Sequence, residues 1–285
     1  MAVRNGLSGL AAWRALVEGQ AGFFLPRLPT PLLQAHAGPA STSWYDTAPL
    51  LATLERLVDF DRINDPRGMR VSVGAVNVRT GNFTYFDNTR ERLRPEHFMA
   101  SGALPPGFPA VEIDGEFYWD GGIVSNTPLY QVLTERPHRD MLVFQVDLWS
   151  ALGELPRDMA GVAERVKDIQ YSSRTRLVTE YMHQSREQQR LLHALMALVP
   201  PERRAEPAFR CAEAAANGAR TNLIHLIYRD KPYEGHFKDY EFSLSSMRSH
   251  WQSGLDDMRH TLAHPSWFDA PPPEQPFVTH DVHRG

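Results

Sequence analysis

Cysteine is almost absent from this sequence of 285 residues, in which Cys211 is the only one. A single thiol excludes a disulfide within the chain, so the composition indicates a reducing compartment. The residues around it, 208–214, have the composition of a helix, and we expect the thiol to be buried there as a structural group. We therefore expect a cytoplasmic protein.

Long apolar runs and a strong excess of one charge are also lacking. No segment approaches the ~20 apolar residues that a membrane-spanning helix needs. Residues 1–19 lack the uninterrupted apolar stretch of a signal peptide, because Arg14 interrupts it, so we expect no signal peptide there. The formal net charge is −4, which gives no reason to expect a nucleic-acid partner. A locally basic surface for peripheral contact with a membrane stays open, and the sequence does not determine the oligomeric state.

What is present is the composition of a soluble globular protein, with 42% hydrophobic and 22% charged residues. The patterns of apolar residues and turn residues predict a series of strands and helices. We expect strands at residues 69–77, 83–86, 111–113, 116–119, 141–148 and 221–228. We expect helices at residues 7–19, 46–58, 95–100, 201–216 and 245–262, one starting at Thr127-Pro128, and a nearly continuous helical stretch over 156–199.

The order strand, loop, helix, strand is typical of an α/β domain. We expect a first region at residues 1–149 and a helical region with a late strand at residues 150–263. Residues 264–285 contain five prolines and no apolar period, so we expect this tail to be disordered.

The segment with the most chemical information lies at residues 101–133. Asp114-Gly115 has the residues of a type I′ turn and predicts a two-residue hairpin. Asp120-Gly121-Gly122 follows its second strand directly. An acyl hydrolase needs a base held in a fixed loop beside its nucleophile, and two glycines let such a loop pack tightly. Taken alone, Asp-Gly-Gly is equally typical of a surface turn.

The surrounding residues favour the catalytic interpretation. The order Ala100-Ser101, Pro105-Pro106, Tyr118-Trp119-Asp120-Gly121-Gly122 and Asn126-Thr127-Pro128 closely resembles the patatin-like phospholipase family. Later segments, DIQYSSRTRL, KDYEFS and LAHP, resemble bacterial members, so the resemblance extends from about Phe23 to His264.

The resemblance implies a patatin-like three-layer α/β fold with a mostly parallel central sheet, here without its amino-terminal strands. It implies hydrolysis of acyl esters in phospholipids or other lipids by a Ser-Asp dyad, with no cofactor and no metal. Asp120 would be the catalytic aspartate, and Gly121 and Gly122 its supporting loop. The rival interpretation is a noncatalytic lipid-binding or interaction protein derived from the family, so whether this chain is an enzyme stays open.

The family's serine nucleophile, which lies in a Gly-x-Ser-x-Gly motif, has no counterpart in the sequence. Residues 6–10, 70–74 and 99–103 each place a serine near glycine, but none has both glycines at the required offsets. We therefore assign no nucleophile. A late start codon or truncated gene, a second chain that supplies the missing part, and a noncatalytic relative remain as explanations, and we favour the first.

Overall fold

A computed structural model describes residues 2–33, 38–134, 139–172, 175–216, 219–229 and 239–281. The chain divides into two compact units. The first combines residues 1–126, 155–171 and 231–247, and the second combines residues 127–154, 172–230 and 248–285. Both units thus contain segments from either side of residue 149, where the sequence analysis placed a boundary.

The first unit is built around a four-stranded antiparallel sheet in the order β4-β3-β6-β5. Its strands are β3 (Ser72–Asn77), β4 (Phe83–Asp87), β5 (Val111–Ile113) and β6 (Glu116–Asp120). Helix α4 (Pro95–Ser101) packs against this sheet. The buried residues between them form the core of the unit, namely Ala75, Phe86, Leu93, Ala100 and Ile113.

The β5–β6 hairpin confirms the interpretation of Asp114-Gly115. Ile113 pairs with Glu116, so the turn has two residues. Both take left-handed conformations, with φ of 52° for Asp114 and 84° for Gly115. A type I′ turn needs positive φ at both central positions. Asp-Gly meets this requirement locally, so the hairpin could be predicted from the sequence.

The other elements of the first unit are helices, two short strands and two 3₁₀ turns. They are α1 (Ala2–Glu18), the paired strands β1 (Leu25–Pro26) and β2 (Tyr45–Asp46), the 3₁₀ turns at Pro31–Leu33 and Pro39–Ser41, α2 (Ala48–Leu57), α3 (Phe60–Ile63) and α6 (Met159–Tyr171). An aromatic cluster holds the strand pair, with Phe24 and Phe108 at 5.3 Å between ring centroids and Phe24 and Tyr45 at 4.7 Å.

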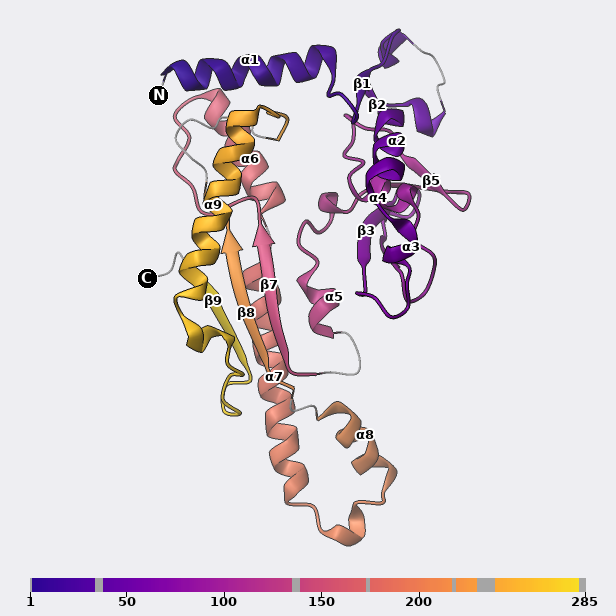
Figure 1. Cartoon of the computed structure of the whole chain (residues 1–285). Coiled ribbons are helices and arrows are strands. Elements are labelled where there is room, and N and C mark those ends of the chain that lie inside the picture. Colours follow the sequence, from indigo (N-terminus) through magenta and orange to yellow (C-terminus); the bar gives the residue numbers. More distant parts are fainter. Residues whose placement is uncertain are drawn as a thin grey trace. The chain divides into compact units, whose positions relative to one another are not determined.

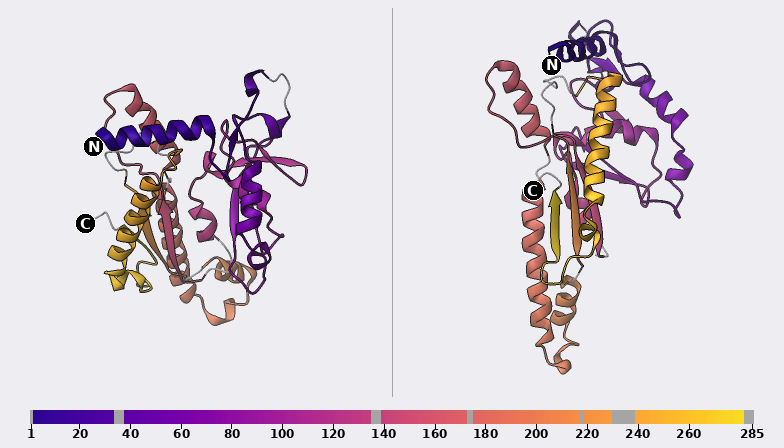
Figure 2. Two further views of the ribbon diagram at one scale, coloured as in Figure 1. Left: turned by 45° about the horizontal axis from the view of Figure 1, so that its top comes forward. Right: turned by 60° about the vertical axis from the view of Figure 1, so that its left-hand side comes forward.

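The second unit contains the parallel sheet that the sequence indicated. Strands β7 (Met141–Asp147), β8 (Thr221–Ile227) and β9 (Phe277–Asp281) lie side by side in that order and all run parallel (Figure 1). Helix α7 (Thr175–Ala197) and the part of α9 (Leu244–Leu262) from Arg248 onward lie on opposite sides of the sheet (Figure 2, right). This α/β arrangement confirms the fold class.

Shorter elements complete the second unit. They are α5 (Leu129–Thr134), α8 (Pro207–Ala215) and the 3₁₀ turns at Pro201–Arg203 and Pro265–Phe268. The core on the α7 side joins α5, α7 and the sheet through Leu129, Leu133, Met182, Leu223 and Phe277. The predicted helical stretch over 156–199 is divided into α6 and α7, with residues 173–174 outside the described part.

The expectation of a disordered tail is wrong. Residues 277–281 form β9, and Phe277 is 1% exposed within the core of the second unit. The strand begins where the amide of Thr221 donates to the carbonyl of Pro276 at 2.8 Å. Residues 277–281 are ordered because they pair with β8, more than fifty residues earlier. The composition of the proline-rich tail alone does not indicate this pairing.

Two expectations about burial are also wrong. Cys211 lies on α8 as predicted, but it is exposed, so it is not a buried structural thiol. From the apolar composition of residues 141–148 we expect β7 to be a buried strand. Its residues alternate instead, and Leu142, Phe144 and Val146 are between 42% and 60% exposed.

Candidate active site

Asp120 is the last residue of β6, where the strand turns into a short 3₁₀ turn at Gly121–Ile123. It lies opposite Ala75 of β3, and its amide donates to the carbonyl of Ala103 at 3.0 Å. The backbone that carries this carboxylate is therefore fixed from two sides. Asp120 also caps the turn, because its Oδ1 accepts a hydrogen bond from the amide of Gly122 at 2.7 Å.

Gly121 is required by close packing. A Cβ atom at this position would lie 2.7 Å from the carbonyl oxygen of Gly74 on β3 and 3.1 Å from the ring of Phe83. Gly74 is itself covered by Phe83, because a Cβ there would lie 2.4 Å from the ring. Two glycines thus let the turn lie directly on β3 and set the place of Asp120.

Gly122 is confined more loosely. A Cβ atom there would lie 3.0 Å from Oδ1 of Asn126 and 3.1 Å from Oδ1 of Asp120. From the motif we expect a positive φ at Gly121 or Gly122, and this is wrong. The described glycines with positive φ are Gly19, Gly22, Gly81 and Gly115. The Asp-Gly-Gly segment needs small residues because side chains do not fit.

The Asp120 carboxylate is in an environment that disfavours its charge. Burial raises the pKa of Asp120, and the hydrogen bond from the Gly122 amide lowers the pKa only in part. Within the described residues, Gly122 is the single hydrogen-bond donor to this carboxylate. A half-buried carboxylate with free acceptor capacity and a raised pKa is a better base than an ordinary surface aspartate.

Tyr171, at the end of α6, belongs to the same environment. Its pKa is raised by burial, with further contributions from the charges of Asp239 and Asp120. Asn126 ties this residue to the turn, since its Nδ2 donates to the carbonyl of Tyr171 at 2.8 Å. Sequence reasoning did not place Tyr171 near Asp120, because the two lie about fifty residues apart and no local spacing links them.

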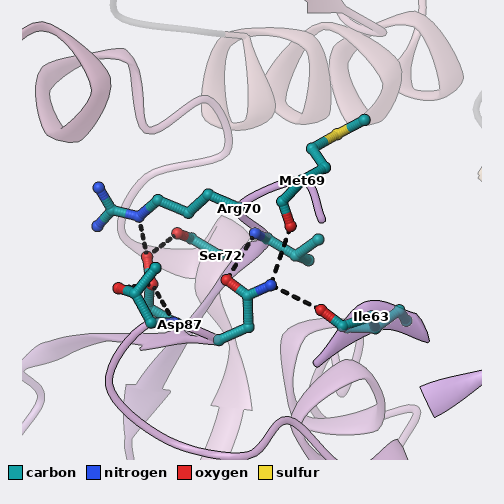
Figure 3. A network of polar contacts seen from close by, with 8 residues as sticks. Ile63, Met69, Arg70, Ser72 and Asp87 are labelled. Atoms are coloured by element: carbon teal, nitrogen blue, oxygen red, sulfur yellow. Dashed lines mark hydrogen bonds and ion pairs between the residues drawn. The ribbon is translucent and has the colours of Figure 1, made fainter. Parts of the chain in front are cut away.

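A second buried aspartate, Asp87 at the end of β4, contacts a serine but has the opposite character (Figure 3). Its carboxylate accepts hydrogen bonds from the hydroxyl of Ser72, from Nε of Arg70 at 2.7 Å, and from the amide and hydroxyl of Thr89. Burial alone would raise the pKa of Asp87, but these bonds outweigh burial and hold it far below its usual range. Such a carboxylate has little tendency to take a proton from a serine hydroxyl, so we do not assign Ser72 and Asp87 as a catalytic dyad.

The other serines considered as nucleophiles are not brought to Asp120 by any described hydrogen bond. Ser8 is buried within α1, and Ser101 is the last residue of α4. Thr127, at the expected start of the next helix, donates its hydroxyl to Oδ1 of Asp147 at 2.8 Å, and α5 begins two residues later. In the part of the chain that the structure describes, no group of three or more His, Cys, Asp or Glu side chains is placed to hold a metal ion.

Two family models match the chain. One, described as patatin-like phospholipase, matches residues 10–133, and the other, described as patatin phospholipase, matches residues 169–274. The chain belongs to the patatin-like phospholipase family. The first match contains Asp120, Gly121 and Gly122, and the two matches together reach further at both ends than the segment from Phe23 to His264.

At the level of the family, the relationship is to lipid acyl hydrolases. No curated protein sequence matches the chain. Among the helices of the described residues, none has the length and apolar content required to cross a membrane.

Proposed function

We propose that this patatin-like chain carries the base of a lipid acyl hydrolase, with Asp120 as the aspartate of a Ser-Asp dyad. The observation that carries the proposal is the half-buried Asp120 carboxylate, whose pKa is raised by burial and which has one described hydrogen-bond donor. In the reaction, Asp120 accepts the proton of a serine hydroxyl as the oxygen attacks the ester carbonyl. It then passes that proton to the leaving alcohol.

The serine is the component that these 285 residues do not supply in a recognisable motif. We propose that a segment outside them, encoded upstream or on another chain, provides both the Gly-x-Ser-x-Gly motif and the oxyanion donors. Gly121 and Gly122 then act as the supporting loop that fixes Asp120 against β3. The substrates are ester lipids, and the protein acts in the cytoplasm or at a membrane surface.

The first experiment measures hydrolysis of short-chain p-nitrophenyl esters by the 285-residue chain. We expect no turnover above background, because loss of a serine nucleophile alone costs on the order of 10⁶ in rate. Turnover that follows the purified protein through every column contradicts this expectation. In that case Ser8, Ser72 and Ser101 are the first residues to substitute.

The second experiment adds the upstream segment, if the DNA before codon 1 encodes the missing motif in frame. Activity should then appear, and Asp120→Asn should lower kcat roughly 10²–10⁴-fold, the usual contribution of a general base. Asp114→Asn is the matched control, because Asp114 lies on the same hairpin and its side chain is 74% exposed. If the Asp120→Asn variant of the extended chain keeps full activity, then Asp-Gly-Gly is a structural turn and not a catalytic segment.

One observation favours the alternative of a noncatalytic lipid-binding protein. Helix α6 exposes an apolar stripe at helical spacing, formed by Met159, Val162, Val166 and Ile169. An apolar stripe on a surface helix is suited to peripheral contact with a lipid bilayer. Cosedimentation with phosphatidylcholine vesicles should then be weakened by Val166→Asp and unaffected by Ala160→Asp, which lies off the stripe on the same helix. Equal binding by all three proteins removes this stripe as the lipid-contacting surface.

A further inference from the structure

The loop between β1 and β2 carries a group of exposed leucines (Figure 1). Leu28, Leu32 and Leu33 are 86%, 80% and 78% exposed, so most of the surface of each side chain faces solvent. Single exposed apolar side chains are ordinary on a protein surface, but a group of them marks a contact surface. We call these three side chains the leucine tip.

The base of this loop is held by several hydrogen bonds. Arg27 donates through Nε to Oγ of Ser43 at 3.1 Å and through Nη2 to the carbonyl of Ala40 at 3.0 Å. The amide of Arg27 donates to the carbonyl of Trp44, and the amide of Trp44 donates to the carbonyl of Pro106. The leucine tip therefore extends from a fixed base.

The loop offers little that a charged partner could recognise. From Phe24 to Asp46, the described residues include one basic side chain, Arg27, and one acidic side chain, Asp46. These two face each other, with Nη1 and Oδ2 3.7 Å apart. Protein interfaces draw most of their binding energy from Trp, Tyr and Arg, and leucine is under-represented among their hot spots. The uncharged leucine tip is therefore better suited to the hydrocarbon of a lipid bilayer than to a protein partner.

The backbone and the base of the loop also fit a bilayer. An amide donor without a partner is costly in hydrocarbon. Pro29 and Pro31 have no amide hydrogen to satisfy. The amide of Leu33 donates to the carbonyl of Thr30 at 2.9 Å. Trp44, at the base, is 42% exposed, and Trp side chains are enriched where the hydrocarbon of a membrane meets water.

We propose that the leucine tip of the β1–β2 loop inserts into the hydrocarbon of a phospholipid bilayer and so holds the protein at a membrane surface. Contact is driven by the burial of apolar side chains, with little contribution from charge. This surface is different from the apolar stripe on α6. Insertion of the loop does not require that Asp120 acts as a base, so the inference stands or fails independently of the proposed hydrolase function.

The test is cosedimentation of the whole 285-residue chain with phosphatidylcholine vesicles. We expect binding that changes little when phosphatidylserine is added to the vesicles or when the salt concentration is raised, because the leucine tip carries no charge. Replacing two leucines together, Leu32→Ser and Leu33→Ser, should lower the partition onto vesicles by a factor on the order of 100, since burial of each leucine side chain is worth a factor of about 10 or more. Absence of binding by the wild type to both kinds of vesicle overturns the proposal.

An exposed leucine elsewhere on the first unit provides the matched control. Leu57, the last residue of α2, is 68% exposed, and Leu57→Ser should bind vesicles as the wild type does. The double variant should keep the Tm of the wild type, because Leu32 and Leu33 are already exposed in the folded protein. Equal binding by the double variant and the wild type contradicts the proposal.

A fluorescent label tests insertion at the tip itself. Cys211, the single cysteine, is replaced by serine, and an environment-sensitive NBD fluorophore is attached at Leu28→Cys. Its emission should move to shorter wavelength when phosphatidylcholine vesicles are added, whereas the same fluorophore at Leu57→Cys should not respond. Vesicle binding without a response at position 28 places the contact elsewhere and overturns the proposal.

A protein contact at the tip has a different signature. The wild type would then fail to bind vesicles and would self-associate in sedimentation velocity, and the double variant would stay monomeric. That result would assign the leucine tip to contact between two copies of the chain, and the bilayer proposal would be wrong.

Discussion

Asp87 and Asp120 end two strands of the same antiparallel sheet, yet their carboxylates are held in opposite ways. Asp87 is 2% exposed and accepts from Ser72, Arg70 and Thr89, so its pKa lies far below the usual range. Asp120 is half-buried and accepts from the Gly122 amide, and burial raises its pKa. Burial acts in the same direction on both groups, and the number of donors decides the outcome.

The difference separates a structural carboxylate from one that is suited to chemistry. The carboxylate of Asp87 accepts hydrogen bonds within the fold, from Ser72 of β3 and from the turn that follows β4, and so joins the two (Figure 3). Asp120 keeps acceptor capacity and is positioned by the backbone and by the absence of a side chain at Gly121. A general base needs a fixed position and a carboxylate that keeps free acceptor capacity. The surroundings of Asp120 provide both.

The largest expected effect on stability is that of Asp87→Asn. An amide has one acceptor oxygen, so its NH₂ group would face donors that now bind the carboxylate and leave them without an acceptor. Breaking a buried charged network costs about 3–5 kcal/mol. Urea unfolding followed by circular dichroism measures the change. Asp65→Asn is the control, because Asp65 forms a surface pair with Arg67 and should show little change. A loss for Asp87→Asn as small as that of the control would mean that the network is not structural.

Gly121→Ala should have the next largest effect. The added methyl group meets the backbone carbonyl of Gly74 at 2.7 Å, and overpacking of this kind costs about 1–3 kcal/mol. Gly122→Ala should cost less, since its nearest contacts are the side-chain oxygens of Asn126 and Asp120. Equal stability of the Gly121→Ala variant and the wild type in urea would show that β3 and the turn are not packed so closely.

The glycines also show what could be predicted from sequence. The Asp114-Gly115 turn was predictable because its conformation is a local property of two residues. Asp120 was found by resemblance of the surrounding motif to a family. The reason for Gly121 was not predictable, because the atom that excludes a side chain belongs to Gly74, which is far away in the sequence.

The same limit explains the elements that sequence reasoning missed. Strand β9 depends on β8 for its order, and the donors around Asp87 come from residues up to seventeen positions away. Strand β7 was found, because seven residues of suitable composition are enough to predict a strand. The exposure of its outer face depends on what packs there, and composition does not contain that information.

Lowering the pH should affect the contributions of Asp87 and Asp120 to the unfolding free energy in different ways. The folded-state pKa of Asp87 is lowered, so its contribution to stability is present above the unfolded value of about 3.9 and is lost as the pH falls through the folded value. The slope of the unfolding free energy from this group is at most about 1.4 kcal/mol per pH unit. Urea unfolding between pH 5 and pH 2 should show a shallower slope for Asp87→Asn than for the wild type. Identical slopes would place the acid sensitivity elsewhere.

The smallest expected effect has the opposite sign and concerns Asp120→Asn. The folded-state pKa of Asp120 is raised, so the ionised carboxylate destabilises the fold above that pKa, and protonation relieves the cost as the pH falls. Asn carries no charge, and its oxygen can still accept from the Gly122 amide. The variant should therefore be more stable than the wild type at pH 7, by on the order of 1 kcal/mol, and the gain should disappear at acidic pH. Asp114→Asn, at the exposed turn of the same hairpin, should show no such gain. If Asp120→Asn is instead destabilised as Asp87→Asn is, then Asp120 is held as a structural carboxylate, and the contrast on which its role as a base rests is lost.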